Sequence, residues 1–241
     1  MKSFGLIGYP LEHSFSKSYF ENKFLNENIK DVEYLNLECQ DLDELFNSEQ
    51  LMKLDGFNVT IPHKENIITY LDELSPEVQA IEAVNCVKNN GGKLVGHNTD
   101  YIGFMNSLKP ILKPHHKSAL VLGNGGATKA VIYALKKLNI IFEIVSRNSS
   151  FDYGDLDKKC IEKYQIIINC TPLGTYPKID SFPQIPYQFL SEKHMLYDLV
   201  YNPKISNFLS YGKKKNCTIK NGIEMLTIQA EQSWKIWKSK N

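Results

Sequence analysis

The chain has 241 residues, of which 42% are hydrophobic and 23% charged, a composition typical of a soluble globular protein with one large domain or two modest ones. Its formal net charge of +1 provides no general attraction to nucleic acid or to acidic membranes, and no apolar run approaches the ~20 residues of a membrane-spanning helix. The five cysteines are odd in number and form no CxxC pair, so we expect no disulfide framework, no metal site and a reduced, cytoplasmic protein.

The first half of the chain predicts alternating strands and helices. We expect strands at about 4–8, 33–38 and 57–60, and helices at about 17–28, 41–52 and 62–71, with a short helix starting at Pro76. The order βαβαβα favours a parallel sheet with helices packed on it. Two further apolar runs, 83–87 and 93–96, flank the sequence Asn-Asn-Gly-Gly and predict a β-hairpin, and a helix is expected from Asp100 to about 112.

Polar residues follow two of these strands. Ser14 and Ser16 precede the first helix, where a serine usually acts as a cap, although two hydroxyls beside helix amides could also hold a small carboxylate. Pro62 suits the first turn of a helix, so we expect Lys64 at the positive end of a helix dipole. A lysine there is either solvated, as most lysines are, or placed to meet an anion or a reacting oxygen. Asp100 is a candidate N-cap.

A second unit is expected after Pro114, where the adjacent His115 and His116 are interpreted as surface-loop residues rather than metal ligands. The apolar run 118–122 predicts a central parallel strand. It leads into Gly-Asn-Gly-Gly-Ala-Thr at 123–128, a helix at about 127–138 and a strand at about 140–145. This strand–glycine turn–helix–strand context indicates dinucleotide binding, although Thr128 stands where the usual GxGxxG motif has its third glycine.

The end of the second strand of this unit indicates which nucleotide binds. An acidic residue there would bind the ribose 2′-hydroxyl of NAD. The chain instead has Ser146, Arg147 and Asn148, and an arginine with two small polar neighbours suits the 2′-phosphate of NADP. The alternative is an exposed arginine on a loop. Further strands are expected at 165–169 and 195–201, and a final amphipathic helix after Gly222.

These pieces resemble the shikimate dehydrogenase family over nearly the whole chain. The matching motifs, in the family's order, are Ser14 and Ser16; 58–62 with Lys64; 83–85; 98–100; 123–127; Asn169 with 171–174; Tyr197, Asp198 and Tyr201; and Gly222, Met225, Leu226 and Gln229. The resemblance implies an α/β fold of two domains with a cleft between them. An α/β substrate domain with a mainly parallel sheet is expected at 1–99 plus 222–241, and a Rossmann-type doubly wound NADP domain at 100–221.

The resemblance also implies an activity, the reversible NADPH-dependent reduction of 3-dehydroshikimate to shikimate in chorismate and aromatic amino acid biosynthesis. The expected partners are this small molecule and the cofactor, with no nucleic acid or membrane, in a monomer or homodimer. Lys64 and Asp100 would be the catalytic pair. Ser14, Ser16 and Tyr201 would hold the substrate carboxylate, and Thr60, Asn85 and Gln229 the ring hydroxyls. The expected cofactor residues are Gly123, Asn124, Gly125, Gly126, Ala127, Ser146, Arg147, Asn148, Thr171, Leu199 and Gly222.

A physical argument for the pair accompanies the resemblance. Hydride addition to a carbonyl leaves an alkoxide that must receive a proton, and a helix dipole would disfavour the ammonium form of Lys64 and so ready its proton for transfer. Asp100 would oppose that effect but fix the orientation of the lysine, so the two are expected to act as a coupled unit. No metal is required, because the cofactor carries the hydride.

Some alternatives stay open. Phe151 stands about where the family often has a second arginine, so one alternative is a sister enzyme that also acts on quinate or uses NAD, although no acidic residue follows Val145. The stretch 149–165 is short, which indicates a trimmed cofactor domain. A ligand-binding protein that keeps the fold without catalysis is an alternative of another class, but it would have no reason to retain Lys64 and Asp100. A folate dehydrogenase is disfavoured by the paired serines and Gln229.

Overall fold

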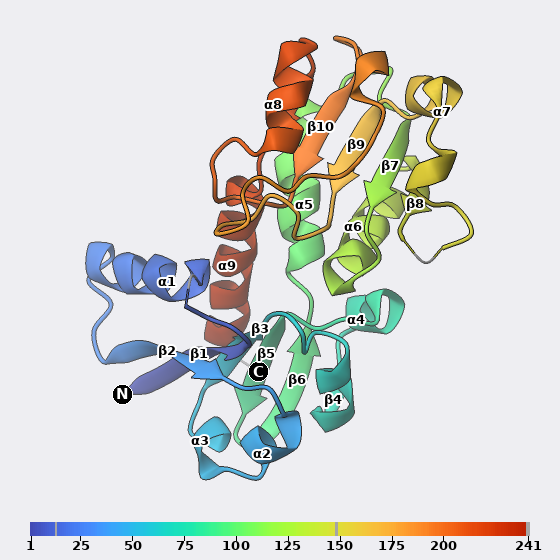
Figure 1. Cartoon of the computed structure of the whole chain (residues 1–241). Coiled ribbons are helices and arrows are strands. Elements are labelled where there is room, and N and C mark those ends of the chain that lie inside the picture. The colour runs from blue at the N-terminus through green and yellow to red at the C-terminus, as the bar shows by residue number, and fades with distance from the viewer. Residues whose placement is uncertain (13, 148, 240–241) are drawn as a thin grey trace. The chain divides into compact units, whose positions relative to one another are not determined.

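The structure, a computed structural model, describes residues 1–12, 14–147 and 149–239. The chain folds into two compact units, which we call the first unit (Met1–Ile102 with Leu226–Asn241) and the second unit (Gly103–Met225). Each unit contains its own β-sheet with helices beside it (Figure 1). The chain passes between the units within two helices, α5 (Asp100–Leu108) and α9 (Ile223–Lys238).

The first unit is built on a six-stranded mixed sheet in the order β2-β1-β3-β5-β6-β4. Its strands are β1 (Lys2–Gly8), β2 (Val32–Glu38), β3 (Gly56–Val59), β4 (Glu73–Leu74), β5 (Cys86–Asn90) and β6 (Lys93–His97). The parallel pairs β1–β2 and β1–β3 are those expected of a βαβ chain. The predicted hairpin is present as β5–β6, and β5 also pairs antiparallel with β3. Strand β4 was not predicted, because two residues carry no periodic pattern.

The helices of the first unit are α1 (Phe15–Asn26), α2 (Leu42–Phe46), α3 (Glu49–Met52) and α4 (Pro76–Ile81). The single helix expected at 41–52 is therefore two short ones. Asn47 ends α2 and Ser48 precedes α3, with the Ser48 hydroxyl donating to the Leu45 carbonyl at 2.7 Å. Asn and Ser favour such helix ends because their side chains compete for backbone hydrogen bonds.

The α-helix expected at 62–71 is wrong, because this segment forms turns and a short 3-10 helix instead. Residues 61–65 form turns after a cis Ile61–Pro62 peptide, and a 3-10 helix, η1, begins only at Asn66 (Asn66–Tyr70). The His63 side chain fastens this segment, because its Nε2 donates to the Cys39 carbonyl at 2.6 Å. Lys64 therefore lies in a turn, and the helix-dipole argument for its charge does not apply.

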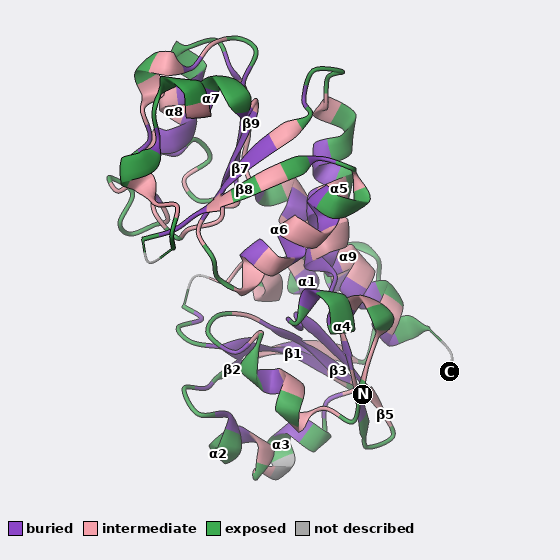
Figure 2. Cartoon of the chain, turned by 90° about the vertical axis from the view of Figure 1, so that its right-hand side faces the viewer, coloured by how far each residue is buried: buried purple, intermediate pink, exposed green. Residues whose placement is uncertain are grey.

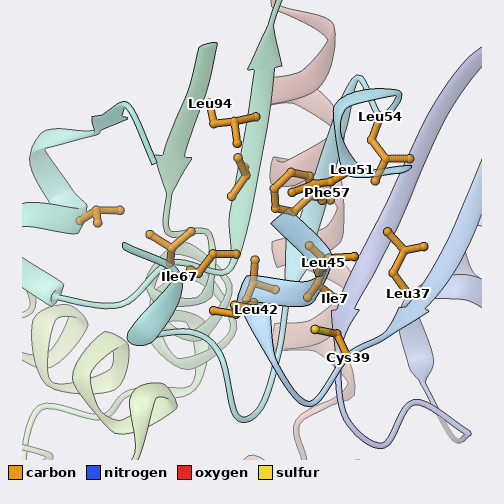
Figure 3. Packing of buried hydrophobic residues seen from close by; sticks show 14 residues of the cluster. Ile7, Leu37, Cys39, Leu42, Leu45, Leu51, Leu54, Phe57, Ile67 and Leu94 are labelled. Carbon is orange, nitrogen blue, oxygen red and sulfur yellow. The ribbon is translucent and has the colours of Figure 1, made fainter. Parts of the chain in front are cut away.

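Both faces of the first sheet carry an apolar core. Side chains alternate along β1, so that Ile7 packs on one face while Phe4 and Leu6 pack on the other. The Ile7 side is covered by α2, α3 and η1, and Figure 3 shows Leu51 of α3 beside Phe57 and Leu45 of α2 beside Ile7. The opposite side is aromatic, with Phe4 lying 4.8 Å, centroid to centroid, from the Trp237 ring of α9.

The second unit contains a five-stranded, entirely parallel sheet in the order β11-β10-β9-β7-β8. Its strands are β7 (Ser118–Leu122), β8 (Ile141–Val145), β9 (Ile166–Asn169), β10 (Met195–Asp198) and β11 (Thr218–Lys220). The inner strand β9 is buried along its length, whereas the edge strand β8 carries exposed residues (Figure 2). The chain order reverses between β7 and β9, where ligands of doubly wound sheets bind. The expected α/β fold is confirmed.

The remaining helices of the second unit are α6 (Gly126–Lys137), α7 (Lys158–Lys163) and α8 (Asn207–Lys214), with four short 3-10 helices in the described part of the chain as a whole. The stretch 149–165 holds α7 and a 3-10 turn at Tyr153–Asp155, one element more than expected. The surface-loop interpretation is wrong for His116. That side chain is buried and accepts the Lys113 amide at Nδ1 (3.0 Å), and burial lowers the pKa of His116 to about 4.

Two features are absent from the described residues. None of their helices has both the length and the apolar character required to cross a bilayer. Among the same residues, no group of three or more His, Cys, Asp and Glu side chains is arranged to hold a metal ion.

Candidate active site

Lys64 and Asp100 form an ion pair in the first unit. Lys64 Nζ lies 2.6 Å from Asp100 Oδ2, and the two side chains are only 15% and 6% exposed. Lys64 is carried by the turn after β3, and its backbone carbonyl accepts the Val84 amide at 2.7 Å. An ammonium group has three N–H donors, and one of those of Lys64 is used within the described residues. The pair is therefore largely shielded from solvent, and the Lys64 ammonium can still donate a hydrogen bond to a ligand oxygen.

Asp100 does not act as the cap of its own helix. It is the first residue of α5, but its carboxylate accepts from Lys64 and, at Oδ1, from Asn85 Nδ2 at 3.0 Å. The Tyr101 amide donates instead to the Asn98 side chain at 3.2 Å. The cap interpretation of Asp100 is corrected accordingly. Because both carboxylate oxygens are engaged by cationic or amide donors, the position of the Lys64 ammonium is fixed from the Asp100 side.

Asn85 joins the ion pair to helix α9. Its Nδ2 lies 2.8 Å from Thr99 Oγ1, 3.0 Å from Asp100 Oδ1 and 3.2 Å from Gln229 Oε1, and its Oδ1 accepts the Thr99 amide at 2.6 Å. A side-chain amide has two N–H groups, so these three acceptors share them. A ligand hydroxyl that accepts from Asn85 would take the place of one of these contacts. The structure thus brings together Lys64, Asp100, Asn85 and Gln229.

Buried hydroxyls and an amide extend this cluster below the surface. Ser233 Oγ lies 3.2 Å from Thr99 Oγ1 and accepts from Asn58 Nδ2 at 2.9 Å, and Asn58 Oδ1 accepts the Tyr34 hydroxyl at 2.9 Å. Burial raises the pKa of Tyr34 well above its usual value, and the Ser16 hydroxyl donates to it, so Tyr34 stays neutral. Ser16 is in this way linked, through Tyr34 and Asn58, to the buried residues beside the Lys64–Asp100 pair.

Ser14 has a hydroxyl without a partner. It occupies the N-cap position of α1, yet its side chain makes no capping hydrogen bond. Its Oγ is buried and has no hydrogen-bond partner among the residues that the structure describes. Buried polar atoms are nearly always paired, so an unpaired one at a helix N-terminus indicates a place for a ligand oxygen.

Thr60 lies between the ends of β1 and β3, where its amide donates to the Ile7 carbonyl at 2.9 Å. The close approach of the two chain segments requires a glycine at position 8, because a Cβ there would clash with Thr60 Cγ2. Tyr201, the remaining expected substrate residue, belongs to the second unit and follows β10.

The glycine turn lies at the switch point of the second sheet. Gly123 has φ +105°, a conformation that favours glycine, and a Cβ there would lie 3.0 Å from Thr171 Cγ2. Gly125 has open space around it and is the N-cap of α6, which starts at Gly126. The start of this 12-residue helix therefore offers backbone amides to an anion, apart from the Thr128 amide, which donates to the Gly125 carbonyl at 2.8 Å. The turn 123–127 and Thr171 are brought together as expected.

The end of β8 contains a second unpaired hydroxyl. Ser146 is buried, its amide donates to Ser149 Oγ at 3.2 Å, and its own Oγ has no partner among the described residues. Arg147 next to it is exposed, and Asn148 lies outside the described residues. An unpaired hydroxyl beside an exposed arginine suits a phosphate.

Leu199 and Gly222 lie side by side after β10 and β11. The Gly222 amide donates to the Val200 carbonyl at 3.1 Å, and a Cβ on Gly222 would clash with the Leu199 carbonyl. Glycine is required here because the two chain segments touch through their backbones.

Several supporting residues were not assigned a role from the sequence. Asn58, Thr99, Asn169 and Asp198 belong to the motifs of the resemblance but carried no predicted function. Ser233 gave one usable signal, since it follows Gln229 by four residues and the two form a polar pair on a helix whose buried face is otherwise apolar.

Comparisons with known proteins lead to one enzyme family. Residues 6–87 match the family described as "Shikimate dehydrogenase substrate binding domain". A shikimate dehydrogenase (NADP(+)) of Caldicellulosiruptor saccharolyticus is 36% identical over 98% of this chain and 92% of the relative. The crystal structure of shikimate dehydrogenase from Aquifex aeolicus is 32% identical, with a TM-score of 0.89 over 99% of this chain and 92% of that one. A Thermus thermophilus shikimate 5-dehydrogenase in complex with NADP(H) and shikimate is 29% identical, with a TM-score of 0.88 over 99% and 94%.

Proposed function

Because this chain belongs to the shikimate dehydrogenase family and is thus an NADP-dependent oxidoreductase, we propose that it catalyses the reversible reduction of 3-dehydroshikimate to shikimate by NADPH. The observation that carries this proposal is the buried Lys64–Asp100 ion pair, held by Asn85 and Gln229. A protein that only binds a ligand has no need to bury this pair. The five cysteines are all free thiols, which suits a reducing cytoplasm.

In the proposed mechanism, the protein handles the proton and the position of the substrate. NADPH, when bound, supplies the hydride. The Lys64 ammonium donates a hydrogen bond to the ketone oxygen and transfers its proton to the alkoxide as that oxygen gains charge. Asp100 accepts from Lys64 at 2.6 Å and so keeps Nζ oriented toward the reacting oxygen. In the reverse direction, Lys64 receives the proton of the substrate hydroxyl.

The substrate carboxylate and ring hydroxyls bind to the polar groups around this pair. The unpaired Ser14 hydroxyl and Ser16, at the start of α1, would bind the carboxylate together with Tyr201. Asn85, Gln229 and Thr60 would bind ring hydroxyls. Since the Asn85 amide is already shared among three acceptors, substrate binding exchanges one protein–protein hydrogen bond for one to the ligand.

The cofactor would bind at the switch point of the second sheet. The pyrophosphate suits the open amides at the start of α6, within the turn Gly123, Asn124, Gly125, Gly126 and Ala127. Thr171, Leu199 and Gly222 line the neighbouring strand ends. The 2′-phosphate would bind Ser146 and Arg147, with Asn148 as the third expected contact; the unpaired Ser146 hydroxyl supports this assignment.

The proposal is tested by following reduced nicotinamide absorbance with the purified chain. Shikimate with NADP should give rapid reduction, whereas NAD with shikimate, or quinate with NADP, should give little. Comparable rates with NAD or quinate would instead assign the chain to the broader sister enzymes. A folded sample without activity in any combination would contradict the proposal and favour a binding protein.

Lys64 is tested by substitution with alanine. Lys64→Ala should lower kcat by at least about 100-fold with a much smaller change in the KM for shikimate, because the proton transfer is lost while most substrate contacts remain. The matched control is Lys93→Ala, which removes an exposed lysine paired with Glu73 at 2.6 Å and should leave both constants unchanged. Near-normal turnover of Lys64→Ala would remove this residue from the mechanism.

A further inference from the structure

A fully buried carboxylate lies beneath the cofactor-binding edge of the second unit. Asp198 is the last residue of β10 and is 0% exposed. Its Oδ1 accepts from Asn169 Nδ2 at 2.9 Å and from the Val200 amide at 3.0 Å, and its Oδ2 accepts from the Ser206 hydroxyl. Burial raises the pKa of Asp198 to about 6, so the group is still mainly ionised at neutral pH and acts only as an acceptor.

The charge of Asp198 determines which way the Asn169 amide points. An ionised carboxylate can face only the NH2 end of that amide, so the Asn169 oxygen must face the opposite way. There Asn169 Oδ1 accepts from the Thr171 amide at 3.0 Å and from Thr171 Oγ1 at 2.6 Å. Thr171 is the residue against which Gly123 packs. The carboxylate therefore acts on the glycine turn through two intervening side chains.

Asp198 also fixes the backbone that follows β10, where Leu199 and Val200 lie. By accepting the Val200 amide it turns the chain directly after β10, which holds Leu199 in place. The Val200 carbonyl in turn accepts the Gly222 amide at 3.1 Å, where the two backbones touch. The expected cofactor residues at the ends of β9, β10 and β11 thus share one buried anchor.

We propose that Asp198 is the positioning residue that aligns Thr171, Leu199 and Gly222 for NADP. It touches neither substrate nor cofactor and acts through Asn169 and the Val200 amide. This inference rests on the proposed function, since it takes these residues to bind the cofactor. The contact with Ser206 serves a separate purpose, because the Ser206 hydroxyl also accepts the Leu209 amide at the start of α8. Substitution of Asp198 therefore tests the contacts to Asn169 and Val200, and substitution of Ser206 tests the contact to the start of α8.

The test compares Asp198→Leu with Ser206→Ala. Asp198→Leu keeps roughly the same side-chain shape but offers no acceptor to Asn169 Nδ2 or to the Val200 amide, both of which donate to Oδ1 in the wild type. It should raise the KM for NADP roughly tenfold or more while the KM for shikimate changes less than about twofold. Ser206→Ala removes a hydrogen bond from the same carboxylate and should lower the melting temperature without changing either KM. A purely structural role for Asp198 predicts the Ser206→Ala pattern for both variants, and that result would overturn the proposal.

A direct binding measurement separates this proposal from the proposed function. Calorimetric titration with NADPH needs no turnover, and Asp198→Leu should show the same weakening there as in KM. If the wild-type chain binds NADPH but does not oxidise shikimate, the proposed function fails while the positioning role remains testable. Should Asp198→Leu not fold, Asn169→Ala replaces it, since Asn169→Ala removes the link to Thr171 and leaves the Val200 and Ser206 contacts of Asp198. Unchanged NADPH affinity in a folded Asn169→Ala would overturn the inference.

Discussion

Among single residues, Asp198 shows how burial changes the pKa of a carboxylate. Its raised pKa, about 6, is caused by desolvation and is opposed by the hydrogen bonds from Ser206, Val200 and Asn169. The titratable groups near it are Tyr187 and Cys170, whose pKa values are both raised by burial, so neither changes charge in the range where Asp198 titrates.

This shift predicts a pH dependence of stability. The folded pKa of Asp198 lies above the ordinary Asp value of 3.8, so the folded state binds a proton more tightly than the unfolded state. The contribution of this group is then fully present at low pH and is lost as the pH rises through about 6, a change on the order of 2–3 kcal/mol. Urea unfolding of the wild type and of Asp198→Asn at several pH values isolates the contribution of Asp198 to the unfolding free energy. The difference between the two proteins in unfolding free energy should change over this range; a constant difference would contradict the prediction.

Among the elements, helix α9 depends on a glycine in a strand it covers. A Cβ on Gly56 of β3 would clash with the Trp237 ring, and with glycine there Trp237 Nε1 donates to the Val87 carbonyl at 2.9 Å. The same helix carries Gln229 and Ser233, which contact the Asn85 and Asn58 side chains. The packing of Trp237 against Gly56 therefore contributes to the geometry around the Lys64–Asp100 pair.

Gly56→Ala is expected to displace helix α9 from the first sheet. The extra methyl group should cost about 1–3 kcal/mol of unfolding free energy through overpacking and should raise the KM for shikimate, because Gln229 moves with α9. Urea unfolding and initial-rate kinetics measure the two effects. In a Trp237→Leu background the same substitution should cost less, since the clashing ring is gone. Equal costs in both backgrounds would mean that the clash with Trp237 is not the cause.

At the scale of the whole molecule, the two units differ in how the chain builds them. The second unit is one continuous segment, whereas the first is completed by residues that follow it in sequence. In the core on the Phe4 side of the first sheet, Phe4, Leu6 and Phe20 come from the N-terminal segment, and Trp234 and Trp237 come from α9. Without α9, this face of the first sheet would lose both tryptophans and would be covered only by α1, which contributes Phe20.

This difference predicts unequal behaviour of fragments. Residues 100–225 should fold alone with a cooperative urea transition, because they contain the complete second sheet and its core. Residues 1–102 should not, since they lack two buried tryptophans, each worth about 3 kcal/mol or more. Joining 226–241 to the shorter fragment through a flexible linker should restore folding, which circular dichroism can follow. Cooperative unfolding of 1–102 alone would contradict this account.

Much of the candidate site could be located from local sequence. The glycine turn at 123–127 follows a buried strand and opens a helix, and that context requires only neighbouring residues to be recognised. The hairpin at 86–97 was predicted for the same reason, since Gly91 and Gly92 supply its turn. The strand preceding Lys64 was also predicted, but the turn that carries the lysine was not, because His63 is held by the carbonyl of Cys39, a residue 24 positions away.

By itself, then, the sequence determined the alternation of strands and helices, the glycine turn and the residue types gathered near each strand end. These features depend on hydrophobic period and backbone freedom, which neighbouring residues decide. Only the tertiary structure decided that Asn85 reaches Gln229, 144 residues away, that Ser14 and Ser146 keep unpaired hydroxyls among the described residues, and that Asp198 lies buried at the end of β10. Burial and hydrogen-bond partners belong to the packing of distant segments, so no local pattern contains them.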